Sequence, residues 1–208
     1  MTTIHLVRHG ETLWHAENRY AGSSDVALTP RGLEQARELA GWVERRVAAG
    51  VRFDAVVTST LTRAILTARP AAEVLGLVPR ADARLCEVHF GRGEGMTRAE
   101  MEEIFPGAVA AFLANPATSP LPDAERGVDA VARARAALTE IAAERPVGTV
   151  LVVAHSTLTR IVLASLLGMD VERYRELLPA VGNCHVTSLE LDAQGEVALL
   201  AYNVPPSA

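Results

Sequence analysis

The sequence predicts an α/β fold, a three-layer αβα sandwich around a mainly parallel sheet with an antiparallel edge strand. Short apolar runs of strand length alternate along the chain with longer segments of helical spacing, which is the pattern of such folds. Apolar residues make up 49% of the chain and aromatic residues only 4%, so we expect a core of Ala, Val and Leu. No internal repeat or domain boundary is visible, and we expect one domain over residues 1–208.

The first half of the chain is expected to contain two strands, each followed by a helix. Residues 3–7 and 53–58 are apolar runs of strand length, which predict two buried strands. Thr29 and Pro30 are residue types that helices prefer as the N-cap and the first helical residue, so a helix is expected to begin there. The second helix follows the second strand, with Ser59 as its N-cap.

The second half is expected to add three helices, a third parallel strand and a hairpin. The segment Thr97–Glu100 has the sequence of a capping box and predicts a short helix. A long helix is expected over residues 125–144, followed by a fully buried strand over 148–154. A helix over 156–167 comes next, and residues 185–202 contain two apolar runs separated by a turn, which predict the hairpin.

Composition and charge exclude several classes of protein. No apolar run reaches the roughly 18–20 residues of a membrane span, and the formal net charge of −5 argues against nucleic acid as a partner. The opening residues MTTIHLVRHG have no basic n-region and no apolar h-region, so we expect a cytoplasmic location. Cys86 and Cys184 lie far apart and outside any Cys-x-x-Cys pattern, which favours reduced thiols over a disulfide or a metal site.

Polar residues follow the three expected parallel strands at the points where these strands end. Arg8 and His9 follow the first strand, Arg63 follows the second, and His155 and Ser156 follow the third. Because the carboxyl ends of parallel strands meet at one edge of a sheet, we expect two imidazoles and two guanidinium groups there. An imidazole is a good nucleophile toward phosphorus, and the planar fork of arginine matches phosphate oxygens two at a time. The pattern therefore predicts a site that holds and attacks a phosphoryl group.

The chain resembles the histidine phosphatase superfamily, whose fold is the phosphoglycerate-mutase-like fold. The resemblance covers most of the chain, and its segments occur in the order of the family. These segments are LVRHGETLW (6–14), GSSDVALTPRGLEQA (22–36), TSTLTRAILTA (58–68), LCEVHFGRGEGMT (85–97) and VLVVAHSTLTR (150–160).

The resemblance implies a role for each of five residues. His9 would be the nucleophile that becomes phosphohistidine, and Glu87 would be the proton donor. Arg8, Arg63 and His155 would complete the phosphate pocket. No metal ion or cofactor is implied. Four further carboxylates close to Glu87 in the sequence compete with it for the role of the acid: Glu94, Glu100, Glu102 and Glu103.

The chain departs from the family pattern at positions close to the expected pocket. The family commonly has Asn where this chain has His15, and Gly where it has Ser156. Both side chains are candidates for binding phosphate or substrate, and the backbone N–H of Gly22 is a third candidate. Because these positions differ, the family does not supply the identity of the substrate.

Two alternative functions compete with hydrolysis. Mutases of the family return the phosphoryl group to an organic acceptor and hold a longer insertion between the acid and the second histidine. The segment from Glu87 to Gly95 is compact, in a manner that resembles the phosphatase branch. A catalytically silent phosphate-binding scaffold usually loses one of the core residues, and this chain retains them. We therefore predict a metal-independent phosphomonoesterase, with a phosphoglycerate-mutase-type phosphoryl transferase and a silent scaffold as the alternatives.

We expect two segments to select the alcohol part of a small-molecule phosphate ester. These are the loop 13–25 and the proline-rich segment 106–124, because function varies most in loops on the ligand side of such sheets. The stretch Pro116–Pro122 carries almost no charge, which favours an alcohol part that is not strongly anionic. The hairpin 185–202 and Trp42 are candidate elements for a homodimer interface.

Overall fold

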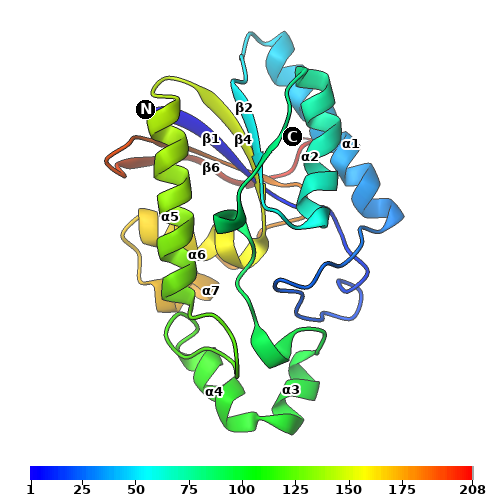
Figure 1. Ribbon diagram of the computed structural model, residues 1–208, viewed down its shortest axis with the longest axis vertical. Coiled ribbons are helices and arrows are strands. Elements are labelled where there is room, and N and C mark those ends of the chain that lie inside the picture. Colours follow the sequence, from blue (N-terminus) through cyan, green and yellow to red (C-terminus); the bar gives the residue numbers. More distant parts are fainter. Residues whose placement is uncertain (208) are drawn as a thin grey trace.

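A six-stranded sheet forms the centre of the protein (Figure 1). The computed structural model describes residues 1–207. The strands are β1 (Thr2–Arg8), β2 (Ala55–Thr58), β3 (Arg80–Ala81), β4 (Thr149–Ala154), β5 (Val186–Leu191) and β6 (Val197–Val204). Their order in the sheet is β3-β2-β4-β1-β5-β6, with β1 to β4 parallel and β5 and β6 antiparallel to their neighbours. The predicted fold class, including the antiparallel edge, is confirmed.

Helices cover both faces of this sheet. One face carries α1 (Pro30–Ala48) and α2 (Thr62–Leu75), and the other carries α5 (Gly127–Glu144) and α6 (Ser156–Leu166) (Figure 1). Shorter helices lie beyond the carboxyl ends of the parallel strands; they are α3 (Arg98–Ile104), α4 (Pro106–Ala114) and α7 (Tyr174–Leu177). No helix within residues 1–207 has both the length and the apolar character needed to cross a membrane.

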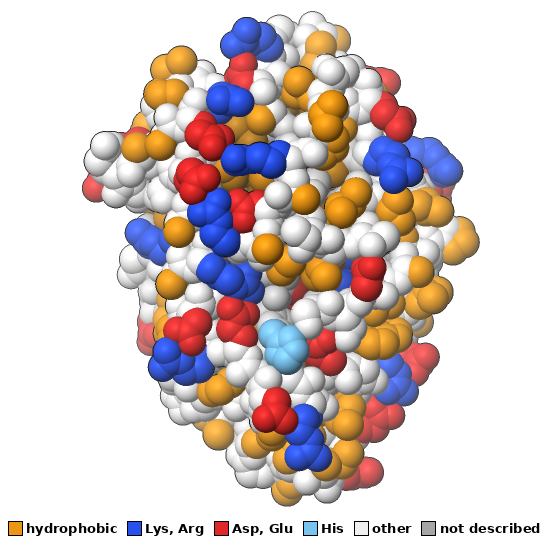
Figure 2. All heavy atoms as spheres, in the orientation of Figure 1, with side chains coloured by type: hydrophobic (Ala, Val, Ile, Leu, Met, Phe, Trp, Pro, Cys, Tyr) orange, Lys and Arg blue, Asp and Glu red, His pale blue; other side chains and the backbone are white. Residues whose placement is uncertain are grey.

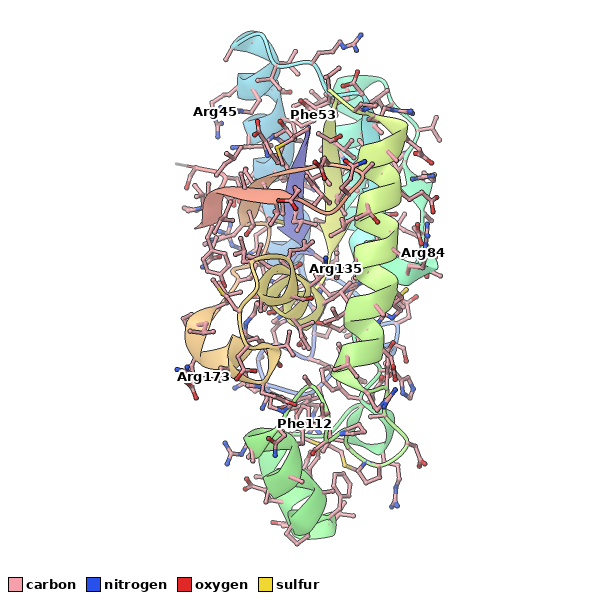
Figure 3. The ribbon with its side chains drawn as sticks, turned by 90° about the vertical axis from the view of Figure 1, so that its left-hand side faces the viewer. Arg45, Phe53, Arg84, Phe112, Arg135 and Arg173 are labelled. Carbon is pink, nitrogen blue, oxygen red and sulfur yellow. The ribbon has the colours of Figure 1, made fainter. Side chains whose placement is uncertain are left out.

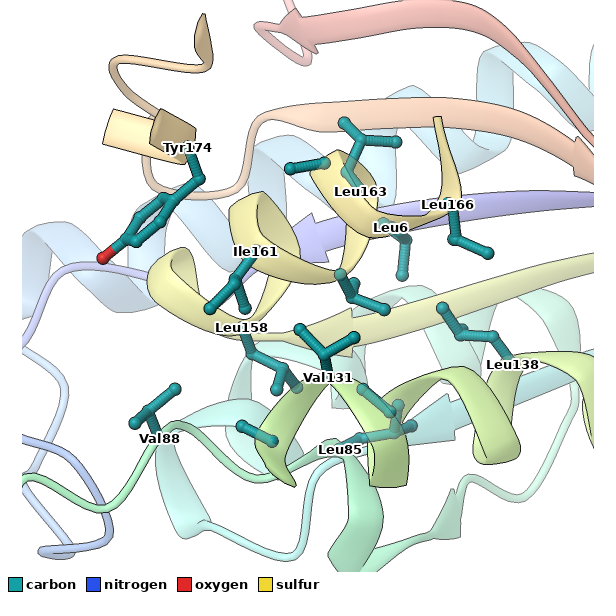
Figure 4. Packing of buried hydrophobic residues seen from close by; sticks show 14 of the residues in the cluster. Leu6, Leu85, Val88, Val131, Leu138, Leu158, Ile161, Leu163, Leu166 and Tyr174 are labelled. Atoms are coloured by element: carbon teal, nitrogen blue, oxygen red, sulfur yellow. The ribbon is translucent and has the colours of Figure 1, made fainter. Parts of the chain in front are cut away.

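Alternate residues of the central strands face opposite helical layers. Ile4 and Leu6 of β1 join the apolar cluster against α5 and α6, whereas Val7 joins the cluster against α1 and α2. Strand β4 divides in the same way, with Val152 in the first cluster and Val153 in the second. Figure 4 shows Leu6 close to side chains of α5 and α6. Burial on both faces pins the register of the strands, because a slip of one residue would exchange the two sets of side chains.

The predicted helix caps are confirmed in two cases and wrong in one. The Thr29 side chain accepts a hydrogen bond from the N–H of Gly32, and the capping box that begins at Thr97 is present. Ser59 does not cap the second helix, which begins only at Thr62. The carboxylate of Asp25 accepts hydrogen bonds from both the N–H and the hydroxyl of Thr62. A residue distant in the sequence therefore supplies the hydrogen-bond acceptor that we expected from Ser59.

Two expectations about surface segments are corrected. The segment 106–124 is not a continuous loop, because its first half forms α4, with Pro106 in the first turn. Trp42 is only 9% exposed and packs edge-to-face against His5, with Phe53 also in contact. Trp42 therefore belongs to the core, and it offers little surface to a second copy of the chain.

Several surface arginines are paired with acidic side chains. On the face shown in Figure 2, basic and acidic side chains lie next to one another and do not separate by sign. Arg84 contacts Asp82 at 2.7 Å and Glu140 at 2.8 Å, and Arg133 contacts Glu125 at 2.7 Å. Such pairs contribute little to stability, about 0–1 kcal/mol each when exposed.

The burial of His5 in β1 predicts that the fold loses stability as the pH falls. His5 is 3% exposed, and burial lowers its pKa to about 4. The unfolded chain takes up this proton near its usual pKa and the folded chain only near pH 4, so the free energy of unfolding falls as the pH drops through that window. A pKa shift of this size in one group changes the free energy of unfolding by roughly 3 kcal/mol. We expect His5→Gln, measured by urea denaturation from pH 7 to 4, to show a flatter pH dependence than the wild type. Equal slopes would contradict this.

Candidate active site

The pairing of the parallel strands brings their carboxyl ends to one place. Arg8 of β1 lies beside Ala154 of β4, and Thr58 of β2 lies beside Val153. The residues that follow these strands are therefore neighbours, and the ring centroids of His9 and His155 are 5.2 Å apart. The convergence of imidazoles expected from the sequence is present.

A cavity of about 370 Å³ opens at this edge of the sheet. Seven of the eight predicted site residues line it: Arg8, His9, His15, Gly22, Arg63, Glu87 and Ser156. The eighth, His155, is fully buried and contacts His9 from behind the cavity wall. The structure thus brings all the predicted residues together, although their chemical roles stay predictions.

His9 is held as a neutral ring with one nitrogen free. Its Nδ1 lies 2.7 Å from the carbonyl oxygen of Gly10, so Nδ1 carries the proton and Nε2 keeps its lone pair. Burial lowers the pKa of His9 well below its usual range, and His155, Arg63 and Arg8 lower it further. A ring that stays unprotonated at neutral pH is ready to act as a nucleophile.

Arg63 is positioned by the loop that follows the nucleophile. It comes from the first turn of α2 and is 1% exposed. Its Nη1 donates to the carbonyl oxygen of Ser24 at 2.7 Å, and its Nη2 donates to that of Gly22 at 2.6 Å. These bonds fix the plane of the guanidinium group, while its buried Nε has no partner among residues 1–207.

Glu94 braces this loop and does not line the cavity. Its Oε1 accepts the N–H of Ser23 and its Oε2 that of Ser24, both at 2.8 Å. Burial alone would raise the pKa of Glu94, but hydrogen bonds from Ser24, Ser23 and Phe90 hold it below the usual value. Gly22 is required beside it, because its φ is +49° and a Cβ there would lie 2.0 Å from Glu94 Oε1.

Arg8 and His15 line the cavity and lie against each other. Arg8 Nη1 donates to the carbonyl oxygen of Val181 at 2.7 Å, and Arg8 Nη2 lies against Nε2 of His15. The N–H of Thr12 donates to Nδ1 of His15 at 2.9 Å. Burial lowers the pKa of His15, and Arg8 lowers it further, while the hydrogen bond to Thr12 raises it. His15 therefore stands beside the guanidinium group of Arg8, where the family pattern commonly has Asn.

Glu87 lies at the N-terminus of α6. Its Oε1 accepts the N–H groups of Val88 at 3.0 Å and Leu158 at 2.8 Å, and its Oε2 accepts that of Thr157 at 2.9 Å. Oε2 keeps a free position for a proton or a substrate oxygen, since it receives one hydrogen bond within residues 1–207. None of the four competing carboxylates lines the cavity, so the geometry favours Glu87 as the acid.

The ring nitrogens of His155 are a second unusual feature of the site. It is 0% exposed, and neither Nδ1 nor Nε2 makes a hydrogen bond within residues 1–207. Burial lowers the pKa of His155 well below its usual range, with Arg63, Arg133 and Arg8 adding to the effect. An unsatisfied buried donor is costly, about 1–3 kcal/mol, which a bound anion would relieve.

The residues of the cavity wall that the sequence reasoning missed include Arg160 of α6 and Tyr174 and Arg175 of α7. A signal existed for Arg160, because it lies one helical turn after Ser156 and so shares its face. No local signal marks α7, which is four residues long. Of the two segments expected to select substrate, the loop 13–25 lines the cavity from His15 to Gly22, whereas no residue of 106–124 does so.

Known proteins are similar to this chain in sequence and in fold. The chain is 32% identical over 192 residues to glucosyl-3-phosphoglycerate phosphatase of Mycobacterium tuberculosis, an alignment that covers 88% of this chain and 83% of that protein. It is 42% identical over 108 residues to the 2,3-bisphosphoglycerate-dependent phosphoglycerate mutase of Thermobifida fusca, which covers 50% of this chain and only 42% of the mutase. The solved structure of Bacillus stearothermophilus YhfR matches with a TM-score of 0.87 at 30% identity, over 98% of each chain.

The match to a family extends over nearly the same range. Residues 4–204 match the family described as histidine phosphatase superfamily (branch 1). This range contains all the strands from β2 to β6 and every residue of the candidate site. The chain therefore belongs to the histidine phosphatase superfamily, branch 1, and is a hydrolase of phosphate monoesters, as its sequence predicts.

Proposed function

We propose that the protein hydrolyses a small-molecule phosphate ester through a phosphohistidine intermediate on His9, without a metal ion or cofactor. The observation that carries the proposal is the state of His9, which is neutral, buried and free at Nε2. Among residues 1–207, buried nitrogens of the neighbouring Arg8, Arg63 and His155 have no hydrogen-bond partner. A phosphate dianion would satisfy them, and these groups would stabilise the charge of the transferring phosphoryl group.

In the first step, Nε2 of His9 attacks phosphorus and forms a P–N bond. The bond from phosphorus to the ester oxygen breaks, and its electron pair leaves with that oxygen. Glu87 gives its proton to the oxygen, so the product leaves as a neutral alcohol. The guanidinium groups of Arg8 and Arg63 hold the non-bridging oxygens throughout, because bidentate arginine contacts match their geometry.

In the second step, water takes the place of the alcohol. The Glu87 carboxylate, which has just lost its proton, accepts a proton from this water. The water oxygen attacks phosphorus, the P–N bond breaks, and its electron pair returns to Nε2 of His9. Inorganic phosphate leaves, and both residues are restored to their starting states.

Hydrolysis is favoured over mutase activity by the extent of the similarity. The alignment with the mycobacterial phosphatase runs along 83% of that protein, whereas the alignment with the mutase covers 42% of its length. The segment from Glu87 to Gly95 is compact, since it passes through the single turn Gly91–Gly93 to Glu94. We infer a cytoplasmic location as well, which the free thiols of Cys86 and Cys184 support.

The test is a phosphate-release assay with chelator present. We expect p-nitrophenyl phosphate and a panel of sugar, nucleoside and amino-acid phosphates to be hydrolysed at the same rate with and without EDTA. A mutase would need priming by a bisphosphorylated donor and would return the phosphoryl group to an organic acceptor. A scaffold would bind phosphate without turnover. Loss of activity in EDTA, restored by a divalent cation, would refute the metal-independent mechanism.

A further inference from the structure

The cavity contains a second group of cationic donors, apart from those that face His9. Arg160 of α6 and Arg175 of α7 line the cavity together with Tyr174. These three residues belong to the segment that follows His155 and come from elements that the phosphate-holding residues Arg8 and Arg63 do not share. We refer to them as the α6–α7 cluster.

The two guanidinium groups of this cluster have no acidic partner within residues 1–207. Every ion pair of the described chain involves other basic residues, including Arg19, which also lines the cavity but is paired with Glu17 and Glu100. Arg160 is partly buried, and burial lowers its pKa; Arg175 lowers the pKa further, whereas Tyr174, Tyr202 and Glu87 raise it. Two neighbouring cations that are partly removed from water and make no ion pair are stabilised when an anion binds between them.

Aromatic rings hold both guanidinium groups in place without neutralising them. The guanidinium carbon of Arg175 lies 4.4 Å from the ring centroid of Phe112 and 5.5 Å from that of Tyr174. That of Arg160 lies 4.9 Å from the Tyr174 ring. Figure 3 shows Phe112 between α4 and the rest of the protein. Stacking on aromatic faces orients arginine while it leaves the edge of the fork free to donate hydrogen bonds.

Several donors of the cluster remain unused. Arg160 donates from Nε to the carbonyl oxygen of Leu178 at 2.6 Å, and neither of its terminal nitrogens makes a hydrogen bond within residues 1–207. Arg175 donates from Nε to the Tyr174 hydroxyl at 3.1 Å, so that hydroxyl accepts from arginine and keeps its own proton to donate. In Figure 4 the Tyr174 hydroxyl points away from the apolar cluster. The free donors match the oxygens of a carboxylate or phosphate.

We propose that the α6–α7 cluster binds a second anionic group, a carboxylate or a second phosphate, on the alcohol part of the substrate. This proposal rests on the hydrolysis proposed above and narrows its substrates to phosphate esters that carry another negative charge. It replaces the expectation of a weakly charged alcohol, which was based on the stretch Pro116–Pro122. That stretch does not line the cavity, so its lack of charge does not act on the substrate.

The test compares esters that differ only in this group. 3-Phosphoglycerate and glycerol 3-phosphate differ by a carboxylate in place of a hydroxymethyl group, and fructose 1,6-bisphosphate and fructose 6-phosphate differ by one phosphate. We expect the wild type to prefer the more anionic member of at least one pair in kcat/KM, by about tenfold to hundredfold, as hydrogen bonds to a charged group allow. The pair with the larger preference identifies the anion as a carboxylate or a phosphate.

Three variants separate recognition from structure. Arg175→Gln and Tyr174→Phe remove a charge and a proton donor respectively, and both are expected to reduce the preference, mainly through KM. Arg173→Gln is the matched control, because Arg173 is exposed, pairs with Glu176 and points outward in Figure 3. It removes the same charge two residues away and should leave the preference intact. Equal losses on both members of a pair in Arg175→Gln would indicate a structural role and overturn the proposal.

A binding experiment keeps this inference separate from the proposed reaction. Calorimetric titration of His9→Ala with 3-phosphoglycerate and glycerol 3-phosphate, and with the two fructose phosphates, measures recognition without turnover. Tighter binding of the more anionic ester, lost when Arg175→Gln is added, supports the anion subsite even if hydrolysis is absent. Equal binding within both pairs refutes the subsite even if hydrolysis is present.

Discussion

Replacing His9 with alanine is expected to lower kcat by roughly 10⁴-fold or more, because the nucleophile itself is lost. The surrounding cationic groups would still bind phosphate, so KM or the affinity for inorganic phosphate should change far less. The measurement is steady-state hydrolysis of p-nitrophenyl phosphate. It is combined with rapid quench of labelled ester, which should trap an acid-labile, base-stable phosphoenzyme in the wild type only.

His89→Ala is the matched control for this variant. His89 lies in the same region of the sequence as Glu87, its side chain is about half exposed, and it does not line the cavity. This variant should keep wild-type turnover and a trapped phosphoenzyme. If His9→Ala retained more than a few per cent of the rate, or still formed the phosphoenzyme, another group would be the nucleophile.

Replacing Glu87 with glutamine is expected to separate the two chemical steps. For an alkyl phosphate, loss of the proton donor should lower the rate by about 10²–10⁴-fold. With p-nitrophenyl phosphate the leaving group departs without a proton, so the first step should proceed and the second, which needs a base for water, should become slow. We expect a burst of one nitrophenolate for each enzyme, followed by a slow phase in which phosphohistidine accumulates.

The control carboxylate is Glu103, an exposed residue of α3. Glu103→Gln should behave as the wild type with both kinds of ester. The amide oxygen of glutamine can still accept the N–H of Leu158, but its NH2 group cannot accept that of Thr157. Circular dichroism would therefore check that Glu87→Gln preserves the start of α6. Equal losses on alkyl and nitrophenyl esters, without a burst, would assign the proton transfers to another group.

Much of the site was predictable because its residues lie immediately beside strong local signals. His9 and His155 each follow an apolar run, and Arg63 lies one turn into the helix that follows another. Parallel strands converge at their carboxyl ends whatever the details of the loops, so position in sequence was enough to predict proximity. The Thr29 and Thr97 caps were predictable for the same reason, since each acts within three residues.

The features that the sequence did not reveal depend on contacts between distant segments. The hydrogen-bond acceptor at the start of α2 is Asp25 and not Ser59, and Asp25 lies 37 positions before Thr62 in the chain. Arg175 reaches the cavity because it stacks on Phe112 of α4, which no local pattern foretells. Spacing in the sequence does not show which carboxylate near Glu87 is the acid. The contacts in the structure do, because Glu94 binds the loop at Ser23 and Ser24, whereas Glu87 lines the cavity.

The hydrogen bonds from Arg63 to the carbonyl oxygens of Gly22 and Ser24 have a consequence for the evolution of new substrate ranges. One side chain serves both phosphate chemistry and the shape of the neighbouring loop, so remodelling that loop disturbs the reaction itself. Helix α7 makes no such bond to Arg63, and its residues can change without this penalty. Directed evolution toward a different alcohol should therefore accumulate tolerated changes around residues 174–175 sooner than around residues 22–24.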